Sequence, residues 1–293
     1  MNESLTYPQT LALTDRLDYL SAHQSRHALC MCIEQAAGIE VSERAQYIRT
    51  IMDELQRIDS HLLFYSCLAM DMGALTPFFY GFREREMILD IFEDTTGGRL
   101  IQNYNVIGGV QADLHPDFVR KTKEFIVHLR SIIHEYHDIF TKSVIARTRL
   151  KGVGLLSRED AISLGCTGGT GRASGWANDV RKHHPYAMYG KVDFKEITYT
   201  HGDAFDRYMV RMDEIMESCR IIEQLIDNVR RGVPGEDEAH SQIARRRVHG
   251  FRRGQPRRVR RVPHRAGGTR RLTVCITEAR GCPWCMPWTP CVG

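Results

Sequence analysis

The sequence predicts a mainly α-helical fold with minor β structure over residues 1–229, and a distinct tail over residues 230–293. Apolar residues recur at steps of three and four along several long stretches, a pattern typical of helices that bury one face. This periodicity stops at Asn228. Composition changes at the same point, because the last 65 residues hold 15 Arg, no Lys and only 4 acidic residues. We therefore interpret the two parts separately.

The first two predicted helices cover residues 11–37 and 42–70. The second has the clearest apolar repeat, and Ser42 can cap its first turn. Gly73 and then Pro77 are expected to end it, because glycine favours helix C-termini and proline interrupts helices.

Two more helices are predicted over residues 116–146 and 204–227, each with a stripe of aromatic, Met and aliphatic residues. We interpret these stripes as core packing and not as a cofactor site. Residues 151–202 between them are glycine-rich and irregular, and no internal repeat occurs.

Composition excludes several classes of protein. The chain of 293 residues is 42% hydrophobic, which is too apolar for a disordered protein. No uncharged apolar run is long enough to span a bilayer, and the N-terminus lacks an export signal pattern. The nine cysteines are therefore expected to be reduced thiols.

Residue chemistry alone offers weak candidate sites. The run Gly168–Gly171 lacks the Lys-Ser/Thr of a phosphate loop, and Ser174 breaks the GxGxxG spacing, so we expect a tight turn with positive φ. The pairs His23/His27 and His183/His184 lack a metal-ligand pattern and are interpreted as ordinary, partly exposed histidines.

Asp71 and Tyr19 are the more interesting polar residues. Asp71 lies between two apolar segments, where a carboxylate can serve proton chemistry or can simply belong to a helix C-terminal turn. Tyr19 in RLDYL is, on residue chemistry alone, a half-buried tyrosine.

Six segments, in order and with matching spacing, resemble the D-subunit family of NADH-quinone oxidoreductase (respiratory complex I). The likeness is greatest to members in which the D and C subunits are fused. The segments are LTDRLDYLSA (13–22), ERAQYIRTIMDELQRIDSHLL (43–63), DMGALTPFFYGFREREMILDIFE (71–93), GGRLIQNYNVIGGVQADL (97–114), GVGLLSREDAISLGCTGGTGRASGWANDVRKHHPYAMY (152–189) and GDAFDRYMVRMDEIMES (202–218). The resemblance implies the helical core of the nickel-iron hydrogenase large-subunit fold, incomplete here.

The resemblance also implies a quinone site. In the family, ubiquinone or menaquinone lies between this subunit and a partner that holds a [4Fe-4S] cluster. A tyrosine and a histidine donate hydrogen bonds to the quinone, and an aspartate pairs with that histidine. Tyr19 matches the tyrosine and Asp71 the aspartate. A phenol can donate a proton to a reduced quinone, and a carboxylate can hold an imidazolium. NADH is used by the whole complex and is not bound here, and no metal site is expected in this chain.

Some features depart from the family. The family histidine and its neighbouring strands would precede Met1, and Ile101 and Gln102 stand where many relatives carry two histidines. A membrane-bound hydrogenase relative is an alternative, but Cys30 and Cys32 are spaced CxC, and the one CxxC lies in the tail.

The tail has two interpretations. Taken literally, it is an Arg-rich nucleic-acid-binding arm with four possible zinc ligands, Cys275, Cys282, Cys285 and Cys291. Alternatively, it is translated out of frame: the codons of residues 252–262, shifted by one base, permit VEASRGEFGV, which resembles the family's C-terminal strand motif. We favour the second interpretation and expect a disordered tail.

We therefore expect a fragment of the quinone-binding subunit of a proton-translocating NADH:quinone oxidoreductase, with little activity alone. Its expected partners are the other peripheral-arm subunits, especially the one that carries the terminal [4Fe-4S] cluster, and no nucleic acid. Its expected location is peripheral, on the cytoplasmic side of the plasma membrane. The alternative is a zinc-dependent nucleic-acid-binding protein with a helical scaffold.

Overall fold

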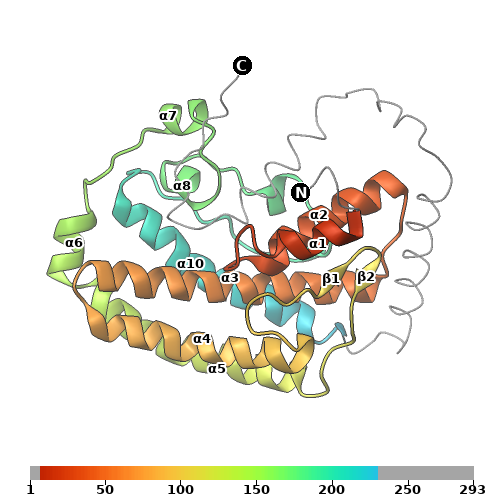
Figure 1. Ribbon diagram of the computed structural model, residues 1–293. Helices are drawn as coiled ribbons and strands as arrows, with labels where there is room; N and C mark the ends of the chain where they lie inside the picture. The colour runs from red at the N-terminus through yellow and green to blue at the C-terminus, as the bar shows by residue number, and fades with distance from the viewer. Residues whose placement is uncertain (1–6, 230–293) are drawn as a thin grey trace.

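The structure is a computed structural model that describes residues 7–229 (Figure 1). It is mainly helical, with a single short hairpin in the described part, as predicted. The predicted tail, its zinc ligands and its frame change lie outside the described residues. No helix of the described part is long and apolar enough to cross a membrane.

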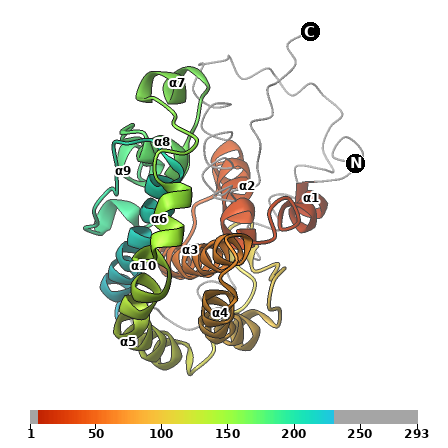
Figure 2. The same ribbon diagram turned by 90° about the vertical axis from the view of Figure 1, so that its left-hand side faces the viewer.

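The longest helix, α3 (Glu43–Asp71), lies at the centre of the fold. It packs on α2 (Ala22–Ala37), α4 (Leu75–Thr96) and α10 (Ala204–Ile226), which surround it in the end-on view of Figure 2. The helix α5 (Phe118–Tyr136) completes the bundle against α4 and α10. Because α3 is covered on most sides, all its residues from Ile48 to Leu62 are buried.

Local signals set the ends of α3 as predicted. The Ser42 hydroxyl accepts a hydrogen bond from the Ala45 amide at 3.2 Å, and the helix ends at Asp71, before Gly73 with φ of +86°. The prediction missed α4, because Pro77 was interpreted only as a terminator. Pro77 lies in the first turn of α4, where a missing amide N–H costs no hydrogen bond.

Two predicted helices prove to be interrupted. Residues 11–37 form α1 (Tyr7–Thr14) and α2, with turns over residues 15–21. The second stretch, 116–146, divides into α5, a π-helical turn at His137–Thr141 and α6 (Val144–Leu150). Apolar periodicity continued across both breaks, so it could not reveal them.

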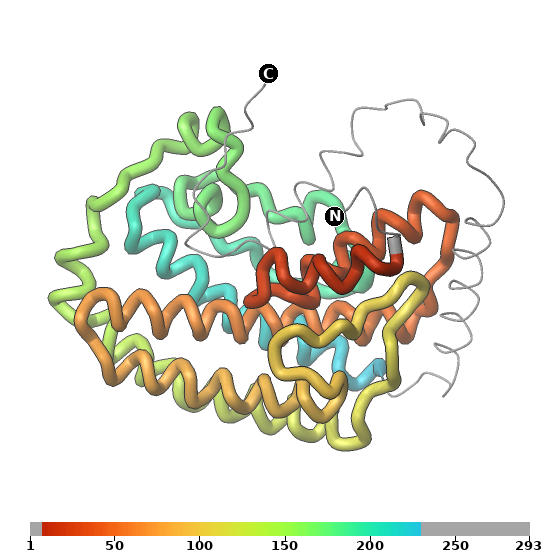
Figure 3. The backbone as a smooth tube through the Cα atoms, in the orientation of Figure 1, coloured from red at the N-terminus to blue at the C-terminus, as the bar shows by residue number. Residues whose placement is uncertain are grey.

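The glycine-rich stretch contains four short helices joined by loops: α7 (Arg158–Ser163), α8 (Gly168–Ala173), α9 (Val180–His183) and the 3₁₀ turn η2 (Tyr189–Lys191). Strands β1 (Asn105–Val106) and β2 (Gly109–Val110) pair antiparallel, with Val106 opposite Gly109. Figure 3 shows this hairpin within a long yellow loop beside the N-terminal half of α3.

The aromatic and Met stripes form the core, as predicted. Met52 of α3 packs in one cluster with Phe125 of α5 and Met212 of α10, all essentially buried. The helices therefore act as a rigid frame that holds the connecting segments in place.

Candidate functional site

Tyr19 lies on the turn of residues 15–21 between α1 and α2, and its side chain is 60% exposed. This contradicts the expectation of a half-buried tyrosine. The turn is closed by Asp18, whose carboxylate accepts from the Leu20 amide at 3.2 Å. The next carbonyl, that of Leu20, accepts from the Gln56 side chain at 3.1 Å. The Tyr19 turn is therefore fixed against the middle of α3.

A buried ion pair anchors the same turn from the other side. Asp15 and Arg26 pair at 3.4 Å, and Asp15 also accepts from the Asn103 amide at 2.9 Å. The Arg26 guanidinium donates further to the Asn103 side chain and to the Asn105 carbonyl. Burial raises the pKa of Asp15, although Arg26 opposes this. The backbone that carries the exposed Tyr19 phenol is therefore held in place by these buried contacts.

Asp71 is the last residue of α3 and is exposed, so it matches the helix C-terminal alternative better than a buried carboxylate. Gln56, which touches the Tyr19 turn, lies 15 residues earlier on the same helix, or about 22 Å along the axis. Within the described part of the chain, no hydrogen bond or ion pair joins Tyr19 to Asp71. The Tyr19 turn therefore packs against the middle of α3, whereas Asp71 ends this helix, and the two side chains are not in contact.

The first histidine pair is buried, so the expectation of partly exposed side chains was wrong there. His27 pairs through Nδ1 with Asp53 at 2.6 Å. His23 packs against the rings of Phe92 and Tyr104, and burial, with Arg26 and His27 nearby, lowers its pKa to about 3. Within residues 7–229, neither belongs to a group of three or more His, Cys, Asp or Glu side chains suited to a metal ion. The second pair, His183/His184, is exposed.

The middle of α3 carries a buried cluster of charges that the sequence analysis did not identify. Glu54 is fully buried and accepts from four donors. These are Arg57 at 3.3 Å, Arg181 at 3.2 Å, Tyr189 at 2.5 Å and Ser218 at 2.6 Å. Burial alone would raise its pKa, but Arg57 and Arg181 outweigh this, and the pKa is lowered. Glu54 therefore stays ionised inside the protein.

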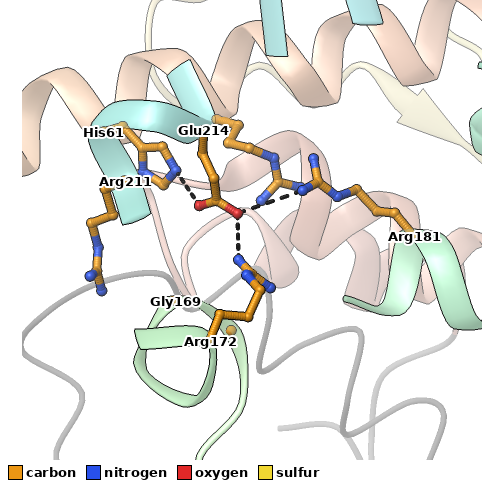
Figure 4. Close-up of a pocket in the computed structure, with 8 residues that line it drawn as sticks. His61, Gly169, Arg172, Arg181, Arg211 and Glu214 are labelled. Carbon is orange, nitrogen blue, oxygen red and sulfur yellow. Dashed lines mark hydrogen bonds and ion pairs between the residues drawn. The ribbon is translucent and has the colours of Figure 1, made fainter. Parts of the chain in front are cut away.

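A second carboxylate, Glu214 of α10, continues the cluster. It pairs with Arg172 of α8, with His61 Nε2 of α3 at 3.0 Å and with Arg181 of α9 at 3.6 Å (Figure 4). These partners outweigh its burial and hold its pKa well below the ordinary value. Burial lowers the pKa of His61, which favours the neutral imidazole.

A cavity opens beside Glu214. The empty space measures ≈ 320 Å³, including the part that is open to solvent. The residues that line it are Arg57, His61, Gly168, Gly169, Arg172, Arg181, Arg211 and Glu214. Gly168 has φ of +66°, as predicted for the glycine run, but the run itself forms the short helix α8 and not the expected loop.

A usable signal for this cluster was present in the sequence. Glu54, Arg57 and His61 are spaced three and four apart, so they share one face of a helix. The apolar residues of the same helix predict that it is buried. Charged residues on a buried face require charged partners. The partners on α8, α9 and α10 are distant in sequence and could not be assigned.

No group of three or more His, Cys, Asp or Glu side chains suited to a metal ion occurs within residues 7–229. Cys30 is buried on α2, where burial raises the pKa of its thiol to about 12. Cys32 is partly buried, and burial raises its thiol pKa as well. Neither cysteine belongs to a group of three or more possible metal ligands among the described residues.

Comparison with known proteins identifies a family. Residues 71–254 match the family described as "Respiratory-chain NADH dehydrogenase, 49 Kd subunit". The C/D subunit of NADH-quinone oxidoreductase from Bacteroides fragilis is 81% identical over 232 residues, which cover 79% of this chain and 44% of that relative. The protein of the same name from Bacteroides thetaiotaomicron is 79% identical over an equal length.

A more distant relative is named for the D subunit alone. This NADH-quinone oxidoreductase protein of Bacillus cereus is 43% identical over 224 residues, which cover 76% of this chain and 61% of the relative. The chain thus spans about half the length of the curated relatives it matches.

Proposed function

The chain belongs to the family of the 49 kDa subunit of respiratory-chain NADH dehydrogenase, and from this premise we propose that it forms the quinone-binding part of an NADH:quinone oxidoreductase. Electrons would arrive from a [4Fe-4S] cluster in a partner subunit and pass to ubiquinone or menaquinone. One observation carries the proposal: the Tyr19 turn presents an exposed phenol, and the buried Asp15–Arg26 ion pair holds that turn in place.

Tyr19 is the proposed donor to a quinone carbonyl. Leu17, two residues earlier on the same turn, is 59% exposed, so the turn presents an apolar side chain as well as a hydroxyl group. A quinone ring needs this combination, because it has apolar faces and two polar oxygens. Because the backbone of the turn is already held in place, only side-chain freedom is lost when the phenol forms the hydrogen bond, and the phenol can then deliver a proton to the reduced ring.

Asp71 has a different proposed role, because it would pair with a histidine that binds the quinone and would not touch the quinone itself. In the family an aspartate pairs with a histidine that donates to the second carbonyl, and no residue of this chain matches that histidine. The exposed carboxylate at the end of α3 is accessible to such an imidazole from another segment. This division of roles does not require Asp71 to touch Tyr19.

The wider setting is also a proposal. We expect the chain to pack against other peripheral-arm subunits of complex I on the cytoplasmic side of the membrane, with NADH oxidised elsewhere in the complex and proton translocation carried out by the complex as a whole.

The proposed role of Tyr19 is tested by Tyr19→Phe in the assembled complex. Loss of one hydrogen bond of about 1.4 kcal/mol should raise KM for the quinone about tenfold and lower kcat, with NADH oxidation by an artificial electron acceptor unchanged. Tyr47→Phe, on the first turns of α3, is the matched control and should leave quinone kinetics as they are. Unchanged KM and kcat in Tyr19→Phe would show that the phenol is not at the quinone.

A further inference from the structure

We propose that Gln56 positions the Tyr19 turn, and that the negative charge of the buried Asp59 holds the Gln56 amide in the orientation that does so. The turn is then held more tightly when Asp59 is ionised than when it carries a proton. The effect of this device on quinone kinetics rests on the proposed function of Tyr19, but the device itself does not.

The Gln56 side chain joins two acceptors that lie on different elements. Its Nε2 donates to the Leu20 carbonyl of the turn at 3.1 Å, and to Oδ2 of Asp59, three residues further along α3, at 3.0 Å. Gln56 is 1% exposed and Asp59 is 0% exposed, so both bonds lie in the interior. The turn is therefore connected to a buried carboxylate through a single amide group.

The charge of Asp59 selects one of the two orientations of the Gln56 amide. An amide nitrogen carries two N–H donors, whereas the amide oxygen can only accept. The Leu20 carbonyl and an ionised Asp59 are both acceptors, so the nitrogen must face them, and the amide oxygen then accepts from Gln102 Nε2 at 3.5 Å. All three contacts agree on this orientation.

A proton on Asp59 removes that selection. The protonated acid can donate its O–H to the Gln56 amide oxygen, and an amide rotated in this way turns an acceptor toward the Leu20 carbonyl. If the amide does not rotate, its bond to the neutral acid is about half as strong as its bond to the carboxylate. In both cases the turn loses part of its attachment to α3.

Asp59 is placed so that its charge can change near neutral pH. Burial raises its pKa to about 7; Arg85 of α4 opposes this shift, and Glu86 of the same helix adds to it. Arg85 Nε lies 3.0 Å from Asp59 Oδ1, but neither atom makes a hydrogen bond within the described part of the chain. The groups that face Asp59 from α3 and from the Tyr19 turn, the Gln56 amide and the Leu20 carbonyl, are neutral.

Hydrogen–deuterium exchange of the full chain tests the positioning without any quinone. The quantity measured is the protection factor of the backbone amides of the Tyr19 turn, corrected for the intrinsic pH dependence of exchange. The Leu20 amide donates to the Asp18 side chain and the Ser21 amide to the Asp18 carbonyl, so both report on the turn. Protection should fall about tenfold from pH 8.5 to pH 5.5, in a step near pH 7.

Asp59→Asn removes the charge and keeps the size of the side chain. Its protection should equal the low-pH value of the parent at every pH, and Gln56→Met, which has no donor, should behave in the same way. The matched control is Asp138→Asn, in the π-helical turn, where the carboxylate is exposed and pairs with Lys142; it should keep the profile of the parent. The parent profile tests the proposal even if a variant does not fold.

Quinone kinetics of the assembled complex provide a second measurement. The KM of Asp59→Asn should exceed that of the parent severalfold at pH 8.5 and equal it at pH 5.5, which a merely structural role of Asp59 does not predict. A parent chain without the step in protection, or an Asp59→Asn chain that keeps it, overturns the positioning. If the step occurs and is lost in Asp59→Asn, but Tyr19→Phe leaves KM unchanged, the positioning stands and the quinone role of Tyr19 fails.

Discussion

The Glu54→Gln substitution should weaken the fold strongly, although the side chain keeps its size. Glu54 is fully buried and holds Arg57 and Arg181 from α3 and α9, together with the hydroxyls of Tyr189 and Ser218. The neutral amide of glutamine removes the negative charge that the buried guanidinium groups of Arg57 and Arg181 share. Removing one partner of a buried ion pair costs about 3–5 kcal/mol, a large part of the 5–15 kcal/mol that stabilises a typical domain.

Urea unfolding followed by circular dichroism measures this loss as a free energy of unfolding, and thermal unfolding should show a fall in Tm of about 6–20 °C. The loss should depend on pH. Because the pKa of Glu54 is lowered in the folded state, its stabilisation is complete above the unfolded value of 4.5 and declines as pH falls further.

The control is Glu124→Gln on α5, whose exposed carboxylate pairs with Arg120 at 3.0 Å. Exposed pairs contribute little, so its unfolding midpoint should stay close to that of the parent chain. If Glu54→Gln unfolds at the same urea concentration as Glu124→Gln, the buried cluster does not stabilise the bundle as described.

Three further predictions concern other parts of the chain. Burial lowers the pKa of His23 to about 3 in the folded protein, while the same imidazole takes up a proton below pH 6.5 in the unfolded chain. The free energy of unfolding should therefore fall by up to about 1.4 kcal/mol for each pH unit between pH 6.5 and 3. His23→Phe should reduce this pH dependence in acid unfolding curves. Gly81→Ala should lower Tm markedly, because its methyl would lie 1.9 Å from Ser66 Oγ and 2.9 Å from the Leu62 carbonyl oxygen, where α4 meets α3; a Tm equal to that of the parent would contradict this close approach. The coding DNA should encode VEASRGEFGV one base out of frame over residues 252–262, and a strand without that peptide would exclude the frame change.

The helical frame was largely predictable, because long apolar repeats mark buried faces. Residues 42–70 and 204–227 were predicted almost to the residue, since Ser42 and Asp203 cap the observed helices and the repeat fills them. The breaks at residues 15–21 and 142–143 were not predictable, because side chains distant in sequence stabilise the first and the apolar repeat crosses both.

The candidate sites divide in the same way. Tyr19 and Asp71 were noted from residue chemistry, their roles at a quinone came from a family resemblance, and these roles stay predictions. The cluster around Glu54 and Glu214 depends on four elements far apart in the sequence, and only its α3 members left a periodic signal. Burial of His27 with Asp53 required the packing of α2 on α3, which no local pattern encodes.

Photolabelling tests the central claim most directly. The assembled complex that contains this chain would be irradiated with an azido-quinone, with and without excess unlabelled quinone, and digested with trypsin. Cleavage after Arg16 and Arg26 releases residues 17–26, LDYLSAHQSR, which contain Tyr19. The account predicts that this peptide carries a label that unlabelled quinone displaces, and a displaceable label found only on other peptides would contradict it.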